Sequence, residues 1–97
     1  MVTRKEQILL HLYGQKGSVS VFQGYYGETQ DGIAEAIGIS RSHVSIEINK
    51  LERMGLVEHS MKHVYVEGRR PHRRNCYRLN GSGLNEVRFM LENRVVA

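Results

Sequence analysis

The sequence predicts an α+β domain in which three helices are followed by a β-hairpin and a fourth helix. Three observations predict this order. Apolar residues recur at helical spacing up to residue 55, strand-like runs then replace them, and helical spacing returns near the C-terminus. A chain of 97 residues with 40% hydrophobic content can form one compact domain with a modest core.

The first helix is predicted over residues 4–14. Thr3 and Glu6 have the spacing of a capping box, in which each residue hydrogen-bonds the other's backbone amide. The apolar positions that follow are Ile8, Leu9, Leu12 and Tyr13. Residues 18–27 are rich in Val, Phe, Tyr and Gly, and their pattern leaves open whether they form a short strand or an ordered loop.

Two further helices are predicted within residues 29–54, separated by a short turn. Thr29 is placed to cap the first of them, and Gly38 is placed to end it, because glycine tolerates the positive φ of a helix C-terminus. Ser40 is placed to cap the second helix, which Gly55 ends. Its apolar stripe consists of Val44, Ile48 and Leu51. This pair predicts a helix-turn-helix unit.

Residues 56–79 are predicted to form a β-hairpin. Strand-like runs lie at 56–67 and 75–79, and the Gly, Pro and Arg residues between them indicate a loop.

A last helix is predicted over residues 82–95, after a cap at Asn80 or Ser82. Its apolar stripe is assigned to Leu84, Val87, Leu91 and Val95. Phe89 and Met90 fall beside or away from this stripe, where exposed apolar side chains favour a homodimer through the C-terminal helix. The alternative is that both residues pack beneath the first helix.

The formal net charge of +4 is concentrated in the second half of the chain. Residues 1–55 carry six basic and six acidic side chains, whereas residues 56–97 carry eight basic and four acidic ones. Most of the excess lies in the segment GRRPHRR, residues 68–74. A concentrated basic patch attracts polyanions.

The sequence also gives expectations about location. No run approaches the roughly 18 consecutive apolar residues of a membrane span, so we expect no membrane partner. The N-terminal apolar patch has no small-residue cleavage site behind it, and a single cysteine, Cys76, cannot form an internal disulfide. We therefore expect a cytoplasmic protein.

Residues 29–59, TQDGIAEAIGISRSHVSIEINKLERMGLVEH, resemble the helix-turn-helix of MarR-like winged-helix regulators, and archaeal regulators with a basic wing are especially similar. KLERMGLVE at residues 50–58 resembles the passage into the wing, and YRLNGSG at residues 77–83 resembles its exit. The matching positions in the two helices are Thr29, Ala34, Gly38, Ile39, Ser40 and Val44. The resemblance implies a winged helix-turn-helix domain that binds double-stranded DNA and regulates transcription.

The third predicted helix has no acidic residue on the face opposite its apolar stripe. At about 100° per residue, this face carries Ser42, Ile46, Asn49 and Arg53, flanked by Ser45 and Lys50. In a major groove, an Asn can bond both edge atoms of adenine, and an Ile can contact a thymine methyl. Ser40 and Arg41 lie at the helix start, where the backbone dipole favours a phosphate.

From this face we expect two kinds of DNA contact. The candidates for base contacts are Arg41, Ser42, Ser45, Ile46 and Asn49, and those for phosphate contacts are Lys50 and Arg53. Ile46 departs from the family pattern, because relatives often place a basic residue there. Glu47 is expected to pair with Lys50 or with the first helix.

The hairpin loop supplies the second signal. Its four arginines, expected to contact phosphates or the minor groove, are Arg69, Arg70, Arg73 and Arg74. Contacts to four phosphates predict a log–log salt slope of about −3.6. The alternative is a solvated basic loop, although four arginines so close together repel one another and gain nothing locally.

Other classes of function find less support. There is no glycine-rich phosphate loop or paired-carboxylate pattern, so we expect neither an enzyme nor a cofactor. A metal site built from His59, His63, His72 and Cys76 matches no established ligand spacing. An RNA-binding or protein-interaction module within a larger assembly stays open, because basic loops also bind RNA and winged helices also serve in assemblies.

Overall fold

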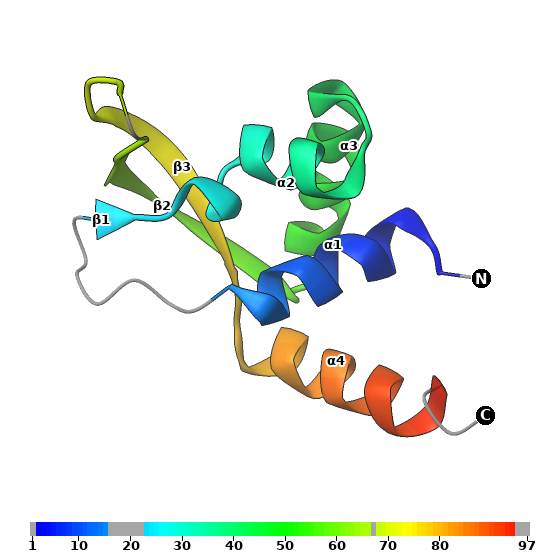
Figure 1. Cartoon of the computed structure of the whole chain (residues 1–97). Helices are drawn as coiled ribbons and strands as arrows, with labels where there is room; N and C mark the ends of the chain where they lie inside the picture. The colour runs from blue at the N-terminus through cyan, green and yellow to red at the C-terminus, as the bar shows by residue number, and fades with distance from the viewer. Residues whose placement is uncertain (1, 16–22, 67, 95–97) are drawn as a thin grey trace.

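The computed structural model describes residues 2–15, 23–66 and 68–94. In chain order, the elements are α1 (Arg4–Gly14), β1 (Gln23–Gly24), the short 3-10 helix η1 (Tyr26–Glu28), α2 (Gln30–Ile37), α3 (Arg41–Arg53), β2 (Val57–Val64), β3 (His72–Leu79) and α4 (Gly81–Arg94). Helices α1, α2 and α3 pack together, the β2–β3 hairpin extends away from them, and α4 lies below α1 (Figure 1). The expected α+β winged fold, with a three-helix core, a hairpin and a C-terminal helix, is confirmed.

Side chains cap the three core helices at the residues that the sequence predicts. The capping box of α1 is formed, since Glu6 N donates to Thr3 Oγ1 at 3.2 Å and Thr3 N donates to Glu6 Oε1 at 3.0 Å. Thr29 Oγ1 accepts from the amide of Gly32 at 3.0 Å, at the start of α2. Ser40 Oγ accepts from the amide of His43 at 3.3 Å, at the start of α3. These caps satisfy amides that would otherwise lack partners in the first turns.

Two glycines fix how α2 is placed. Gly38 adopts φ of 79° at the C-terminus of α2, a conformation that side chains with a Cβ disfavour, and so permits the tight turn into α3. Gly32 packs so closely on η1 that a Cβ there would overlap the carbonyl oxygen of Tyr26. Helix α2 is thereby held directly against the segment that precedes it.

The core lies where the three helices meet the hairpin. The apolar stripe of α3, predicted as Val44, Ile48 and Leu51, is completely buried. Around it pack Ile8, Leu9, Leu12, Ile33, Val57, Tyr77, Val87 and Met90. Because the stripe faces inward, the opposite side of α3 faces solvent.

The three-stranded sheet has the order β1-β2-β3. Strand β1 pairs in parallel with β2, where Gln23 lies opposite His63. This places a short strand within the segment 18–27 that the sequence left open, although residues 18–22 lie outside the described residues. Strands β2 and β3 are antiparallel, with Val57 opposite Leu79 at their base.

One boundary of the hairpin was predicted wrongly. Strand β3 begins at His72 rather than at Asn75, so Arg73 and Arg74 belong to the strand and not to the loop. In the backbone register of the hairpin, Arg73 lies opposite His63 and Arg74 lies opposite Lys62. The pairing partner on β2 imposes the extended conformation, which overrides the turn-like composition of the segment.

The phase of the last helix was also predicted wrongly in part. Asn80 is its cap, since Asn80 Oδ1 accepts from the amide of Gly83 at 2.9 Å. Met90 is only 8% exposed and belongs to the core, whereas Leu91, assigned to the core stripe, is 36% exposed. Phe89 is 60% exposed, so it does not pack beneath α1. Val95 lies outside the described residues.

Candidate nucleic-acid interface

The outer face of α3 has the exposure that a recognition surface needs. Arg41, Ser42, Asn49, Lys50 and Arg53 are exposed, as is Ser40 before the helix. Ser45 is half-buried at the flank of the face, and Ile46 is 52% exposed. The side chains chosen from helical periodicity therefore lie at the surface, and their alignment along one helix allows them to approach one partner together.

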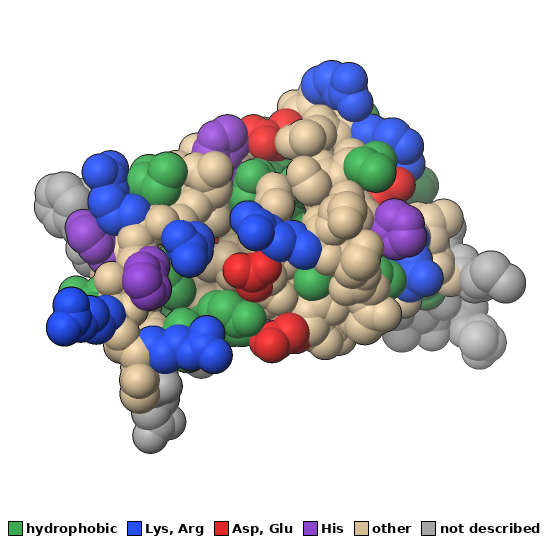
Figure 2. Space-filling view, turned by 90° about the horizontal axis from the view of Figure 1, so that it is seen from above, with side chains coloured by type: hydrophobic (Ala, Val, Ile, Leu, Met, Phe, Trp, Pro, Cys, Tyr) green, Lys and Arg blue, Asp and Glu red, His purple; other side chains and the backbone are tan. Residues whose placement is uncertain are grey.

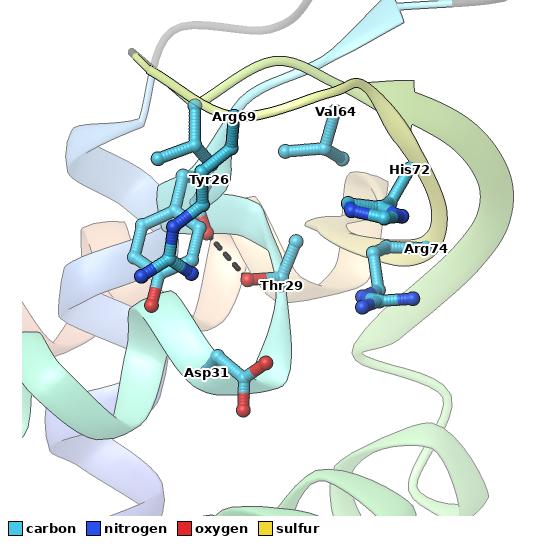
Figure 3. Close-up of a pocket in the computed structure, with 8 residues that line it drawn as sticks. Tyr26, Thr29, Asp31, Val64, Arg69, His72 and Arg74 are labelled. Carbon is cyan, nitrogen blue, oxygen red and sulfur yellow. Dashed lines mark hydrogen bonds between the residues drawn. The ribbon is translucent and has the colours of Figure 1, made fainter.

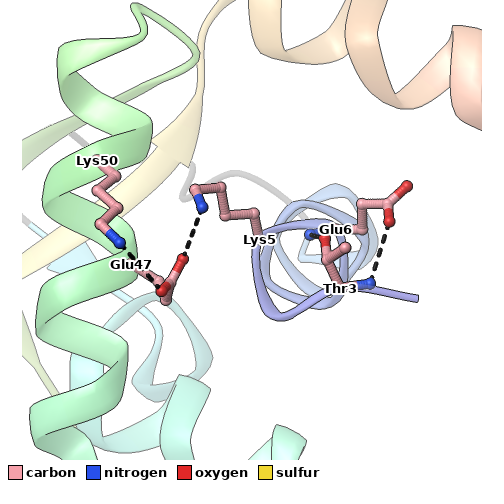
Figure 4. Close-up of polar contacts among 5 residues, drawn as sticks. All are labelled: Thr3, Lys5, Glu6, Glu47 and Lys50. Carbon is pink, nitrogen blue, oxygen red and sulfur yellow. Dashed lines mark hydrogen bonds and ion pairs between the residues drawn. The ribbon is translucent and has the colours of Figure 1, made fainter. Parts of the chain in front are cut away.

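Glu47 lies at the flank of α3 that faces α1, where it is neutralised. Its two carboxylate oxygens contact the ammonium groups of Lys5, at 3.2 Å, and of Lys50, at 3.7 Å (Figure 4). The expectation that Glu47 pairs with Lys50 or with the first helix is confirmed on both counts. These ion pairs neutralise the negative charge of Glu47 at the flank of the outer face. The positive charge of Lys50 is partly neutralised by the same contact.

The hairpin carries its four arginines into solvent. Arg69, Arg70, Arg73 and Arg74 are all exposed. Seen from above, basic side chains gather over the hairpin at one end of the molecule and recur over the helix-turn-helix toward the other end (Figure 2). The hairpin and the helix-turn-helix thus offer basic groups on one side of the molecule.

Two hollows lie between the hairpin and α2, and together we call them the α2–hairpin groove. The first, of about 80 Å³, is lined by Tyr26, Thr29, Asp31, Val64, Val66, Arg69, His72 and Arg74 (Figure 3). The second, of about 270 Å³, is lined by Thr29, Gln30, Asp31, Arg41, Met61, Arg73, Arg74 and Asn75. Three residues line both hollows: Thr29, Asp31 and Arg74.

Asp31 is the residue of this region that sequence reasoning missed. Its Oδ1 lies 3.3 Å from Nε of Arg41, and the two side chains are 43% and 65% exposed. Nothing local marks Asp31 in the sequence, because it pairs with the next helix and faces a hairpin far along the chain. The one available signal is its place in the first turn of α2, where acidic residues are common for helix stability alone.

Tyr26 borders the same groove. Burial raises the pKa of its hydroxyl most. A hydrogen bond to Glu35 and the negative charges of Glu35 and Asp31 raise this pKa further, whereas the positive charge of Arg69 lowers it. A tyrosine hydroxyl is protonated at neutral pH even at its ordinary pKa of about 10, so Tyr26 forms an uncharged part of the groove wall.

Two charged side chains near Cys76, Glu28 and Lys62, are buried. Glu28 is only 2% exposed, and it accepts a hydrogen bond from the amide of Tyr25 at 2.8 Å and lies 3.8 Å from Arg78 Nη2. Lys62 is 5% exposed in the same region. Burial raises the pKa of the Cys76 thiol most, and the negative charge of Glu28 raises it further, to about 11. The positive charges of Lys62 and Arg78 offset part of this shift. A protonated, buried thiol is a poor nucleophile and a poor metal ligand.

The histidines do not gather with Cys76 around a metal. Among residues 2–15, 23–66 and 68–94, no three His, Cys, Asp or Glu side chains lie close enough together to hold one. His59 instead places Nδ1 2.7 Å from Glu52 Oε2 and packs its ring on Tyr77, with the ring centroids 5.3 Å apart. Within these same residues, no helix has the length and apolar character to cross a membrane.

Neither the protein-family models nor the curated proteins give a match to the sequence. Solved structures do match in fold. A mutant of MepR from a multidrug-resistant S. aureus clinical isolate superposes with a TM-score of 0.67, at 24% identity over 94% of this chain and 56% of that chain. A second S. aureus MepR mutant gives a TM-score of 0.66 at 24% identity over 95% and 57% of the two chains. The S. aureus MepR–DNA complex gives 0.65 at 24% identity over 95% and 55%.

The chain thus spans little more than half the length of the MepR chains that it matches. At this identity the likeness establishes the fold. The chain therefore has the winged helix-turn-helix fold, which it shares with the MepR chains.

Proposed function

We propose that this chain is a DNA-binding transcription regulator. The observation that carries the proposal is the outer face of α3, exposed and without an acidic residue, which shares one side of the molecule with the basic hairpin. The likeness in fold to the S. aureus MepR–DNA complex supports it. In this proposal α3 enters the major groove, and the hairpin, as the wing, contacts the adjacent backbone or minor groove.

Base reading is assigned to the middle of α3. Asn49 is exposed and carries the amide that can pair with both edge atoms of an adenine, and Ile46 offers an apolar contact to a thymine methyl. Ser42 and Ser45 lie toward the N-terminal end of the helix, from which side chains of recognition helices contact base edges. Arg41, expected from the sequence to contact a base, is assigned here to a phosphate, because its guanidinium pairs with Asp31 of α2.

Phosphate binding is assigned to the basic side chains around this reading face. Lys50 and Arg53 flank the last turns of α3, and the helix start at Ser40 presents amides to a phosphate. On the wing the contacts come from Arg69, Arg70, Arg73 and Arg74. Such contacts act on every sequence alike and make binding steeply dependent on salt.

Equilibrium binding to three probes tests the proposal: a random-sequence duplex, a single strand and a structured RNA of equal length, each over a salt series. We expect the duplex to bind tightest, with a log–log slope of about −3.6 or steeper, because four wing arginines and further cations of α3 replace counterions. Equal or tighter binding to RNA favours an RNA-binding module, and no salt-dependent binding to any probe favours a protein-interaction module. Either result contradicts the proposal.

We further propose that two copies pair through α4. Phe89 is 60% exposed and Leu91 is 36% exposed on this helix, and burying apolar surface favours association. A symmetric dimer would present two α3 helices to half-sites about 34 Å apart. Sedimentation equilibrium at micromolar concentration should show a dimer that Phe89→Glu converts to a monomer, and a monomeric parent protein would contradict this assignment.

These proposed roles also imply a cellular location. We place the regulator in the cytoplasm, where its DNA would be, and the proposal includes no catalytic step, no metal and no cofactor.

A further inference from the structure

We propose that Asp31 acts as an internal competitor of DNA: its carboxylate holds Arg41 in the α2–hairpin groove until a backbone phosphate takes its place. The inference rests on the proposed DNA binding and adds a residue of α2 that opposes it. An autoinhibitory contact of this kind lowers the affinity of the domain for any duplex by a few fold.

The position of Asp31 is the first observation. It lines both hollows of the groove, where arginines of the hairpin border it. In Figure 3 the Asp31 carboxylate lies on α2 below Thr29, and Arg69, His72 and Arg74 descend from the hairpin around the same opening. Among the lining residues that the structure describes, Asp31 supplies the carboxylate, and it lies where cationic groups converge.

The contact with Arg41 is the second observation. Arg41 is the first residue of α3, and its Nε lies 3.3 Å from Asp31 Oδ1. Both side chains are substantially exposed, at 65% for Arg41 and 43% for Asp31. An exposed pair of this kind contributes little stability, so exchanging the carboxylate for a phosphate oxygen costs little. Arg41 can thus turn from α2 to DNA without disturbing the fold.

The charge of the groove identifies the competing group. Its lining contains four arginines, Arg41, Arg69, Arg73 and Arg74. Pockets for whole small-molecule ligands are instead mostly apolar. A phosphodiester, which is small, anionic and attached to a polymer outside the groove, matches this charge and fits hollows of about 80 and 270 Å³.

Replacing Asp31 with asparagine tests the inference, because the side chain keeps its shape and loses its charge. We expect Asp31→Asn to bind every duplex about 3- to 5-fold tighter near 0.15 M salt, because an exposed ion pair, which is weak, no longer competes with DNA for Arg41. The log–log salt slope should steepen by up to about 0.9, because Arg41 becomes a full phosphate contact. Preference among sequences should not change, since phosphates carry no sequence information.

Two further variants make the experiment specific. Glu86→Gln removes the same charge from an exposed residue of α4, and it should leave affinity within about twofold of the parent protein. Asp31→Asn in an Arg41→Gln background should gain much less than in the parent background, because the side chain that Asp31 holds is absent. Circular dichroism of each variant checks that the fold is retained.

Three results would overturn the inference: unchanged affinity in Asp31→Asn, an equal gain in Glu86→Gln, or a full gain that persists in the Arg41→Gln background. The proposed function fails separately. If neither the parent protein nor Asp31→Asn binds duplex DNA, the assignment of DNA binding is wrong and the inference falls with it. If the parent protein binds and Asp31→Asn binds no tighter, only the role of Asp31 is wrong.

Discussion

Helices α2 and α3 are neighbours with similar construction and opposite charge. Each begins at a hydroxyl cap, Thr29 or Ser40, and each buries one apolar side. The outer face of α3 carries no acidic residue, whereas α2 exposes Glu35 and presents Asp31 to the groove. Under the proposed function, α3 has the charge to approach a polyanion, whereas α2 carries the charge that opposes this approach.

The largest expected effect concerns how firmly α2 is placed beside α3. Gly32→Ala would force a Cβ into the carbonyl oxygen of Tyr26, and backbone atoms must shift to relieve the overlap. We expect the free energy of unfolding to fall by about 3 kcal/mol, measured by urea denaturation. Gly14→Ala at the end of α1 is the matched control, because a Cβ there meets nothing within 4 Å. Equal effects of the two substitutions would contradict this account of α2.

The next effect tests whether α3 reads sequence. After selection of a preferred duplex from a random pool, Asn49→Ala should lower discrimination between that duplex and a random one by about 1 to 3 kcal/mol. The loss arises because an alanine cannot pair with a base edge. Asn85→Ala, an exposed asparagine of α4, should change nothing. If preferred and random duplexes weaken equally in Asn49→Ala, the base-reading role is wrong.

The hairpin provides the cationic counterpart of α2. Replacing Arg69 and Arg70 with glutamine should weaken binding to all duplexes by about 10- to 30-fold and flatten the log–log salt slope by about 1.8, because two phosphate contacts disappear. A double control, Arg4→Gln with Arg88→Gln, removes the same charge from exposed residues of α1 and α4. An unchanged slope in the Arg69 and Arg70 variant would remove the hairpin from the mechanism.

The smallest expected effect sharpens the apolar part of the α3 face. Ile46→Ala should reduce affinity for the preferred duplex by less than about 1 kcal/mol, since only a contact with a thymine methyl is lost. Replacing thymine with uracil in the duplex should weaken the parent protein and leave Ile46→Ala unaffected. If uracil weakens both proteins equally, Ile46 does not contact the methyl group.

The helix-turn-helix could be predicted from sequence because its signals are local. Thr29, Gly38 and Ser40 act on their own turns, through caps and a positive φ, and the stripe of Val44 follows from the helical period. The exposure of Asn49 follows in turn from that stripe. Because these patterns depend only on residues close together in the chain, the sequence alone predicts which side chains lie on the outer face of α3.

The hairpin boundary and the phase of α4 depend on distant contacts. Arg73 and Arg74 are in a strand because His63 and Lys62 pair with them, which their own composition does not indicate. In α4, Val87 was placed correctly in the core, but the helix buries Met90 rather than Leu91 beside it. Apolar residues occur on both sides of Val87, so the sequence pattern fits either phase, and docking against the rest of the fold decides between them.

The α2–hairpin groove could not be predicted for the same reason. It brings Asp31 of α2 together with Arg69 and Arg74 of the hairpin, residues that are separated by the whole of α3 and β2. Only the fold creates their proximity. The contact that would temper DNA binding is therefore a tertiary feature, whereas the residues proposed to read DNA belong to one helix.

Amide chemical-shift mapping by NMR tests the central claim most directly, since a 97-residue chain suits the method. On titration with the selected duplex, we predict the largest shifts along the outer face of α3, at Ser42 and Asn49, and at Arg69 and Arg70 of the hairpin. Helices α1 and α4 should shift little. Shifts concentrated on α4, with the outer face of α3 unaffected, would contradict the proposed interface.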